Sequence, residues 1–589
     1  MKNKSLFLLV VLLLGMFLVA CASGGDVGGE TVAEPAATTA ATVASTGASD
    51  EAESSEPVES HESEAAPSSS GDSEEHMPEE LGTVDFPISC TAEAHAEFNH
   101  GLAALHSFWF PPASESFATA AELDPTCAMA YWGLAMTHLG IPWSPTPPDS
   151  LALGQAAVDE ALALGAPTER EQAYINAIAM FYKDADTLDH GPRALAYEAA
   201  MEQLAQDFPD DTEAQIFYAL ALLITASPTD KSYANPLRAI EIMEPIFAEQ
   251  PDHPGTAHYL VHGHDYPDLA AGGVEAALRF AEIAPAAPHA LHMPSHIFTR
   301  LGYWQDSIAT NMAGAAAANA ALAPSSEPGT AFEPALHAMD YMMYGYLQLA
   351  RDEAAKALVD EISAIKQATG GLGSAYALSA IPARYVLERG AWAEAAALTL
   401  YPPEFAWENF PQAEATIVFA RGLSAARLGD VEAANQAVER MQALQEALTT
   451  ANEGYWAGQV AIQIEEVAAW NALAEGNADE ALATMRHAAE LEAATEKHPV
   501  TPGPILPAYE LLGELLLELD NPAEALAAFE TSLQEDPNRF RGVYGAARAA
   551  ELAGDTAKAE AYYSQLVELA ATADGERPEV TQAQEFLSQ

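Results

Sequence analysis

Positive charge is what this sequence lacks most. Its 589 residues include 24 Lys and Arg against 86 Asp and Glu, which gives a formal net charge of −62 at pH 7. Nucleic acid is bound through basic side chains that neutralise its phosphates, so a surface this acidic repels it. The composition therefore excludes nucleic acid as a partner and favours a soluble, strongly acidic surface.

Long apolar runs are also scarce, and the clearest one lies at the very start. Residues 5–19 are almost wholly apolar, follow Lys2 and Lys4, and end at Leu18-Val19-Ala20-Cys21. The run is shorter than the ~20 residues that a membrane-spanning helix needs, and the pattern is typical of a secretory signal. The last four residues resemble a lipoprotein signal-peptidase site. The resemblance implies cleavage before Cys21 and lipid attachment to its sulfur, and an ordinary signal peptide with a chance cysteine is the alternative.

This start predicts both the compartment and the domain organisation. We expect a signal peptide at 1–20, the lipidated Cys21 with a disordered acidic linker over 21–85, and a folded part over 86–585. The linker is rich in Ser, Ala, Thr, Gly and Glu and has no apolar periodicity, so it cannot offset the entropy of ordering. The predicted location is the cell envelope, outside the cytoplasm: the outer membrane or periplasm of a two-membrane cell, or the surface of a one-membrane cell.

Cysteine is rare, with three in the chain. With Cys21 assigned to lipid, Cys90 and Cys127 remain in an oxidising compartment, where an even number favours pairing. A disulfide between them is one interpretation, and two buried free thiols are the other.

The sequence also lacks the common catalytic motifs. There is no H-E-x-x-H, G-x-S-x-G, Walker A, G-x-G-x-x-G or C-x-x-C pattern. A metal-activated water is the one mechanism that the remaining residues could support.

From residue 91 onward the chain reads as successive helices rich in Ala, Leu and Glu, broken at Gly, Asp and Pro. The signature is clearest near the end, at Leu512, Gly513, Ala525, Phe529 and Pro537. A second copy near the start contains Gly101, Ala113, Phe117, Ala120 and Pro125. This spacing resembles the tetratricopeptide repeat (TPR), in which small residues let two antiparallel helices approach and an aromatic ring fills the gap. The resemblance implies an all-α TPR-type solenoid, a right-handed superhelix of roughly ten to twelve helix-turn-helix repeats.

Longer segments resemble a family of uncharacterised secreted bacterial TPR lipoproteins. The matching segments are CAMAYWGLAM (127–136), HYLVHGHD (258–265), HMPSHIFTRLG (292–302), LHAMDY (336–341) and VTPGPILPAYELLGELLL (500–517). The resemblance implies a shared architecture and brings no reaction with it.

Histidines recur in register with the repeat. His258 and His262 are four residues apart, as are His292 and His296, and the two pairs are separated by one 34-residue TPR period. Residues four apart share a helical face. In the TPR family these helix positions line the concave groove, so the resemblance implies that the four side chains converge on one wall.

The sharpest interpretation of this cluster is a metal site, because neutral imidazole is the commonest transition-metal ligand and a nearby carboxylate completes or orients the set. The predicted ligands are His258, His262, Asp265, His292, His296, His337 and Asp340. Zn²⁺ is the first expectation, with Fe, Cu or Ni as alternatives. The histidines could instead line a peptide groove or form a buried polar network, and Pro294 could break the helix between His292 and His296.

The predicted function is a lipid-anchored scaffold that binds a protein or peptide in its concave groove and holds a metal there. The predicted groove residues are Trp132, Met136, His289 and Tyr344. A metal-dependent enzyme, a hydrolase or an oxidoreductase, that uses the same histidines is the main alternative. A structural lipoprotein with incidental histidines is a third.

Overall fold

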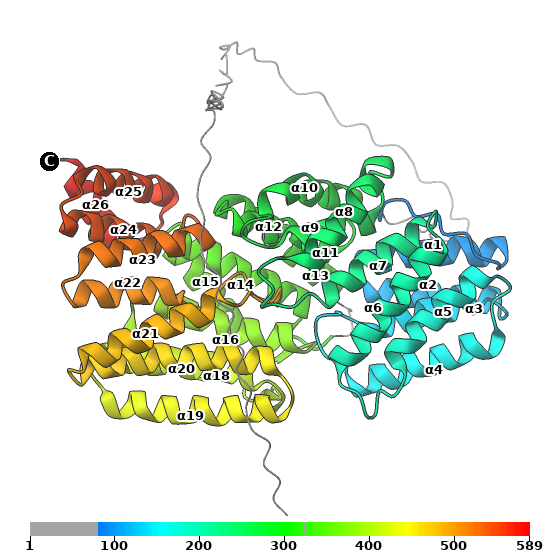
Figure 1. Cartoon of the computed structure of the whole chain (residues 1–589), viewed down its shortest axis with the longest axis horizontal. Helices are drawn as coiled ribbons and strands as arrows, with labels where there is room; N and C mark the ends of the chain where they lie inside the picture. Colours follow the sequence, from blue (N-terminus) through cyan, green and yellow to red (C-terminus); the bar gives the residue numbers. More distant parts are fainter. Residues whose placement is uncertain (1–79, 323–325) are drawn as a thin grey trace, which may run out of the picture. The chain divides into compact units, whose positions relative to one another are not determined.

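Helices follow one another along the computed structural model, which describes residues 80–322 and 326–589 (Figure 1). The N-terminal half contains α1 (Ala92–His106), α2 (Phe110–Leu123), α3 (Ala128–Leu139), α4 (Pro148–Leu164), α5 (Glu169–Tyr182), α6 (His190–Asp207), α7 (Thr212–Ile224), α8 (Ala234–Glu249), α9 (Pro254–His264), η1 (Ala270–Gly273), α10 (Val274–Ile283), α11 (Pro288–His292), α12 (Pro294–Arg300) and α13 (Trp304–Ala321).

The C-terminal half contains α14 (Glu333–Gln348), α15 (Asp352–Ser363), α16 (Leu372–Leu387), α17 (Trp392–Ala395), η2 (Trp407–Asn409), α18 (Pro411–Leu428), α19 (Val431–Thr450), α20 (Gly454–Ala474), α21 (Ala478–Ala493), α22 (Ala508–Glu518), α23 (Pro522–Glu535), α24 (Phe540–Ala553), α25 (Thr556–Leu569), η3 (Ala570–Thr572) and α26 (Pro578–Leu587). Two short strands, β1 (Thr330–Ala331) and β2 (Gln367–Ala368), pair in parallel with Thr330 opposite Gln367. With α11 and α12 counted as one broken helix, the described residues form twelve helix pairs followed by α26, which confirms the all-α fold class.

Tight turns separate the two helices of a pair where glycines mark them in the sequence. Gly302, Gly390, Gly429, Gly476 and Gly554 all have positive φ values, between 61° and 87°, and each lies between two helices. That region of backbone conformation is open to glycine without steric cost, so these residues end the first helix of the pair.

Aromatic rings hold neighbouring helix pairs together at glycines. A Cβ added to Gly513 would lie 2.6 Å from the Phe529 ring, and one added to Gly545 would overlap the same ring. Phe117 packs in the same way against Gly101 and Gly133. The repeat signature therefore acts as expected: the missing side chain lets a large ring enter between helices.

The superhelix closes on itself inside each half. Helix α1 contacts α9, and α14 contacts α24, although each pair is far apart in the sequence. The inner faces of these helices consequently pack against one another, and the buried core follows the chain from Leu81 to Ala583.

The folded part begins earlier than residue 86. Leu81 and Phe86 are buried, Thr83 N donates to the Asp252 carbonyl oxygen over 3.0 Å, and the Phe86 ring stacks on Trp132. Residues 81–85 thus belong to the packed structure and not to a linker, because their apolar side chains have a core to enter. The predicted signal peptide, Cys21 and most of the predicted linker lie outside the described residues.

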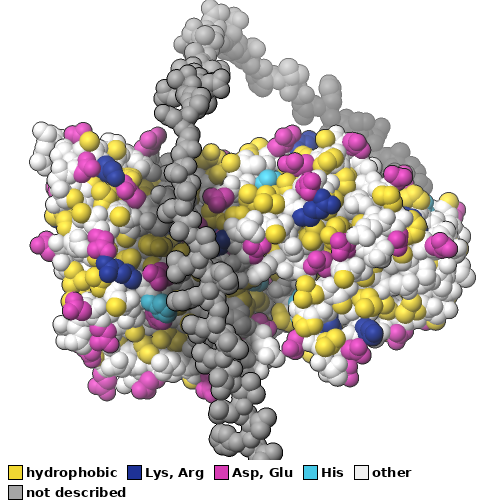
Figure 2. Space-filling view, in the orientation of Figure 1, with side chains coloured by type: hydrophobic (Ala, Val, Ile, Leu, Met, Phe, Trp, Pro, Cys, Tyr) yellow, Lys and Arg dark blue, Asp and Glu magenta, His cyan; other side chains and the backbone are white. Residues whose placement is uncertain are grey.

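The surface is as acidic as the composition implies. Figure 2 shows carboxylates scattered over the visible face, with few Lys and Arg among them. Within residues 80–322 and 326–589, no helix is both long and apolar enough to cross a membrane.

Candidate metal centre

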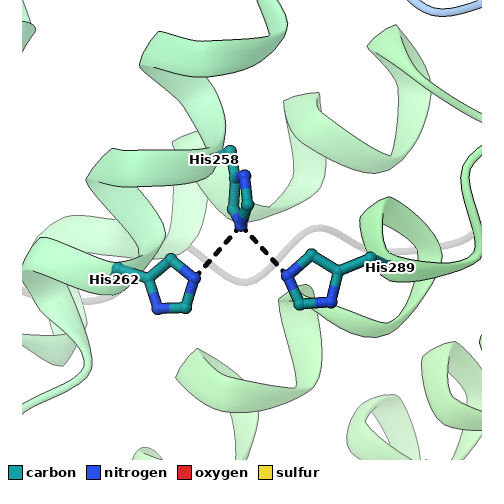
Figure 3. A group of neighbouring side chains, drawn as sticks. All are labelled: His258, His262 and His289. Atoms are coloured by element: carbon teal, nitrogen blue, oxygen red, sulfur yellow. Dashed lines mark hydrogen bonds between the residues drawn. The ribbon is translucent and has the colours of Figure 1, made fainter. Parts of the chain in front are cut away.

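The first histidine triad joins two helix pairs. His258 and His262 lie one turn apart on α9, and His289 comes from α11. The His258 Nε2 atom lies 3.1 Å from His262 Nε2 and 3.1 Å from His289 Nε2, so three ring nitrogens meet at one point (Figure 3). These three histidines form a group that could hold a metal ion.

The proton on His258 has a defined place. Its Nδ1 lies 2.6 Å from the His106 carbonyl oxygen, which can only accept a hydrogen bond, so Nδ1 carries the proton. Burial lowers the pKa of His258 to about 3, and the imidazole is therefore neutral at pH 7. Its Nε2 consequently presents a lone pair to His262 and His289, as a metal ligand would.

The second triad consists of His292 on α11, His296 on α12 and His337 on α14. The Nε2 atoms of His292 and His296 lie 3.0 Å apart, and the His292 and His337 ring centroids lie 4.5 Å apart. Helix α11 ends at His292 and α12 begins at Pro294, so Pro294 does break the helix, yet the two imidazoles still face each other.

Acceptors outside the triad fix the protons of this pair as well. His292 Nδ1 lies 2.6 Å from Asn311 Oδ1, and Asn311 Nδ2 donates to the Ser307 carbonyl oxygen, which orients the amide. His296 Nδ1 lies 2.9 Å from Asp265 Oδ2. Burial lowers the pKa of both histidines, so each neutral ring carries its proton on Nδ1. Two unprotonated Nε2 atoms therefore face each other across 3.0 Å.

The two triads are neighbours. The rings of His262 and His296 have centroids 6.0 Å apart, as do those of His289 and His292. His289 of the first triad and His337 of the second triad are half-buried. Six imidazoles thus form one cluster, in which each triad has one member nearer the surface.

Asp265 orients a ligand and does not face the converging nitrogens. Its carboxylate accepts from His296 Nδ1, from Arg300 Nε at 2.9 Å and from Lys497 Nζ at 2.9 Å. Although Asp265 is buried, Lys497 and Arg300 hold its pKa well below the usual range. The predicted direct ligand is therefore a positioning residue, because its lone pairs are already taken by donors.

Asp340 was predicted as a ligand, and the structure places it apart from both histidine triads. Its Oδ1 lies 3.0 Å from Arg384 Nε in a fully buried ion pair, and Asp340 belongs to neither triad. The guanidinium comes from α16, and the sequence offered no signal that the two would pair.

A third group, which the sequence did not predict, is a satisfied hydrogen-bond network. The Glu213 carboxylate lies 3.0 Å from His106 Nε2 and 2.9 Å from His253 Nε2. His253 Nδ1 accepts from Gly255 N and His106 Nδ1 lies 3.0 Å from the Tyr259 hydroxyl, so each Nε2 carries the proton that the carboxylate needs. This group could hold an ion, but it is complete without one.

The predicted groove residues are mostly inside the core. The exposed fractions of Trp132, Met136 and Tyr344 are 1%, 5% and 1%, and His289 belongs to the first triad. Phe86 covers Trp132, and Arg539 donates to the Tyr344 hydroxyl over 2.6 Å. The groove assignment was wrong at these three positions, because the chain fills its own inner surface.

Near the histidines, the inner surface is occupied by one loop. The loop of residues 494–507, between α21 and α22, places Lys497 on Asp265, and the Tyr341 hydroxyl donates to the carbonyl oxygens of Pro499 and Thr501. Cys90 and Cys127, at the other end of the fold, form a disulfide with a Cα–Cα distance of 5.2 Å.

An open groove does exist in the C-terminal half. Its volume is about 380 Å³, and its walls come from α22, α23, α24, α26, the end of α18, and the turn between α16 and α17 with the start of α17. Among the lining residues are Arg389, Trp392, Arg427, Arg541, Tyr544 and Arg548. Four of the few arginines in this acidic chain therefore meet at one concave surface.

Comparison with known proteins supports the repeat. Residues 506–539, which comprise α22 and α23, match the family model described as the tetratricopeptide repeat. The solved human IFIT1 dimer with PPP-AAAA has 12% identity and a TM-score of 0.33, and the match covers 82% of this chain and 92% of that one. The P58(IPK) TPR domain has 11% identity and a TM-score of 0.20, covering 79% and 99%, and the APC/C hetero-tetramer Cut9-Hcn1 has 12% and 0.33, covering 79% and 78%. No curated protein matches the sequence.

The TM-scores of these structures are too low to support any functional argument. Residues 506–539 are similar to a tetratricopeptide repeat, and the matched segment coincides with the helix pair α22–α23 of the fold. Such repeats suggest a protein-interaction scaffold, and the buried histidine groups of this one could hold a metal ion.

Proposed function

We propose that the chain is a lipid-anchored, extracytoplasmic TPR scaffold that holds a transition-metal ion at its histidine cluster. The observation that supports a metal ion is the pair of unprotonated Nε2 atoms of His292 and His296, 3.0 Å apart in a buried site. Two lone pairs that face each other in a low-dielectric interior repel, and a cation between them turns the repulsion into attraction.

The donor set favours a borderline metal. Zn–N bonds are about 2.0–2.1 Å long, so two nitrogens on a tetrahedral ion lie roughly 3.3 Å apart. The observed Nε2 separations of 3.0 and 3.1 Å need only a small outward shift to admit one. Imidazole suits Zn, Fe, Cu and Ni, with Zn²⁺ the first expectation.

A metal-dependent enzyme is the second candidate. Each triad offers three imidazoles, and a three-ligand set leaves a position for water or substrate on a four-coordinate ion. The half-buried members, His289 and His337, lie on the side where such a molecule would enter. A metal-bound water would serve a hydrolase, and a redox metal would serve an oxidoreductase.

Elemental analysis tests the metal. Protein purified without a His tag and offered Zn, Fe, Cu and Ni should retain about one equivalent or more. Changing both His292 and His296 to Ala should remove about one equivalent while the helical circular-dichroism signal survives. The matched control is His487→Ala, since His487 is exposed and its ring bonds the Glu465 carboxylate, away from both triads. Retention of less than about a tenth of an equivalent by the unaltered chain would refute the proposal.

The open groove at α22 and α24 is the surface that we propose for a protein or peptide partner. Arg427 and Arg541 share the Glu514 carboxylate there, beside the Trp392 ring. Guanidinium groups next to aromatic faces suit a carboxylate-bearing peptide segment. The groove is open where the inner surface near the histidines is closed, and this supports placing the partner in the C-terminal half.

A further inference from the structure

A second, smaller cavity lies between α18, α20 and the loop of residues 494–507. Its volume is about 60 Å³. Aromatic side chains form much of its wall, namely Tyr376, Phe419, Tyr455 and Trp456. The polar lining comes from Gln412, Gln463, Glu466, Glu492 and Lys497, among others.

Acceptor oxygens without partners line this cavity. The exposed fraction of Glu466 is 2% and that of Gln412 is 9%, and within the described residues their Oε1 atoms have no hydrogen-bond partner. The Oε1 atom of Gln463 is in the same state. Buried polar atoms in native proteins are nearly always paired, so three unpaired acceptors around one cavity indicate a bound donor.

The two carboxylates of the cavity have no cation of their own. Burial and the neighbouring Glu492 raise the pKa of Glu466 well above its usual range. Glu492 is half-buried, and its Oε1 accepts from Ala508 N over 2.7 Å. Lys497 also lines the cavity, but its Nζ is held by Asp265, so no ion pair between a Lys or Arg and either carboxylate occurs in the part of the chain described.

We propose that this cavity binds a small organic ammonium ion. An alkylammonium group donates three hydrogen bonds, which matches the unpaired Oε1 atoms of Glu466, Gln412 and Gln463. Its positive charge would allow the two carboxyl groups, which lack a Lys or Arg partner, to ionise, and the Trp456 and Tyr455 rings offer faces for cation–π contact with its alkyl-bearing nitrogen.

Other ligand classes fit the cavity less well. An anion brings further acceptors to a cavity whose unpaired Oε1 atoms are themselves acceptors. A calcium ion is surrounded by six to eight oxygen ligands, whereas aromatic side chains form much of the wall of this cavity. No histidine is among the residues that line the site, and the proposal does not depend on the proposed metal.

Calorimetric titration of the full chain tests the site with three probes of equal size. Propylammonium should bind in a saturable manner, whereas 1-propanol lacks the charge and propionate has the opposite one. We expect both controls to bind at least about tenfold more weakly, since a charge-assisted hydrogen bond in a buried site is worth at least that factor.

Glu466→Gln keeps the shape of the side chain and removes the group that would ionise beside a bound ammonium, and it should weaken propylammonium binding at least about tenfold. Glu490→Gln on α21 is the matched control, because Glu490 is exposed, and it should bind as the unaltered chain does. If Glu466→Gln does not fold, the preference of the unaltered chain among the three probes still decides the question.

Three results would overturn the proposal. They are equal binding of propanol and propylammonium, no saturable binding of either, and saturable binding of Ca²⁺ that excludes propylammonium. An unaltered metal content in Glu466→Gln is expected, and it separates this test from that of the histidine cluster.

Discussion

At the scale of single residues, the partner of one ring nitrogen decides what the other can do. The Nδ1–H group of His258 donates a hydrogen bond to a carbonyl oxygen, so its Nε2 atom is unprotonated. In His253 the Nδ1 atom accepts a hydrogen bond, and the Nε2–H group donates to Glu213. The first arrangement prepares a metal ligand and the second completes a hydrogen-bond network. Two buried histidines five residues apart therefore have different chemistry.

Glu492 should make stability depend on pH. Burial raises its pKa to about 8, above the usual value near 4.5, so the folded chain holds a proton there that the unfolded chain loses. Because the folded state binds more protons across this window, the free energy of unfolding should fall as the pH rises from about 5 to about 8. The slope should stay below the ~1.4 kcal/mol per pH unit of one fully buried group, since Glu492 is half-buried.

Urea unfolding at several pH values measures this slope. Glu492→Gln should flatten it, and Glu490→Gln on the same helix should leave it unchanged. An equally steep slope in Glu492→Gln would assign the proton to another group.

The sequence predicted part of this residue chemistry. The 34-residue register correctly brought His258, His262, His292 and His296 to one place, because the register follows from the repeat itself. It could not show that Asp265 positions a ring or that Asp340 pairs with Arg384. Those roles depend on donors that reach the carboxylates from distant helices, and nothing in a local pattern encodes them.

At the scale of elements, a helical glycine that faces an aromatic ring is required for packing, whereas a helical glycine in open space is not. Gly545 on α24 faces the Phe529 ring, so Gly545→Ala should lower the free energy of unfolding by about 1–3 kcal/mol through overpacking. A Cβ added to Gly458 on α20 would meet no atom within 4 Å. Gly458→Ala should therefore raise the free energy of unfolding by roughly 0.5–1 kcal/mol, because alanine has the higher helix propensity. Chemical denaturation of both variants measures the difference, and equal effects would show that the ring does not fill the position.

Element boundaries were largely predictable because they are marked by residue type. Glycines at positive φ end the first helix of five pairs, and Ala350, at a φ of 53°, marks the turn between α14 and α15 as the register required. The packed segment before α1 was missed. Its apolar residues, among them Leu81 and Phe86, follow directly on an acidic, Ser-rich stretch. Their burial depends on contacts with distant helices, which a local sequence pattern does not reveal.

At the scale of the whole molecule, tight superhelical closure explains why the predicted groove residues are buried. Contacts between α1 and α9, and between α14 and α24, bring inner faces together that would be open in a wider solenoid. Family positions name the face a residue is on, but the curvature of the superhelix determines whether that face meets solvent or another helix.

The proposed anchor belongs to this scale as well. Radiolabelled palmitate should be incorporated into the full chain expressed in a bacterium and not into Cys21→Ser.

The same fractions should contain a partner that crosslinks to the chain. Arg541→Ala should reduce the crosslink, while the exposed Arg486→Ala should not. Equal labelling of Cys21→Ser would contradict the anchor, and an unchanged crosslink in Arg541→Ala would move the partner elsewhere.

The loop of residues 494–507 has a consequence for the timing of metal uptake. It is held by Asp265, Tyr341 and Arg384, which lie more than a hundred residues earlier in the chain, so its contacts can form only once these distant segments have come together. If the histidines hold the proposed ion, its exchange would be slow, because its release would require these contacts to break together. The metal content of the purified chain would then depend on the ions supplied while it folds as well as on those offered afterwards.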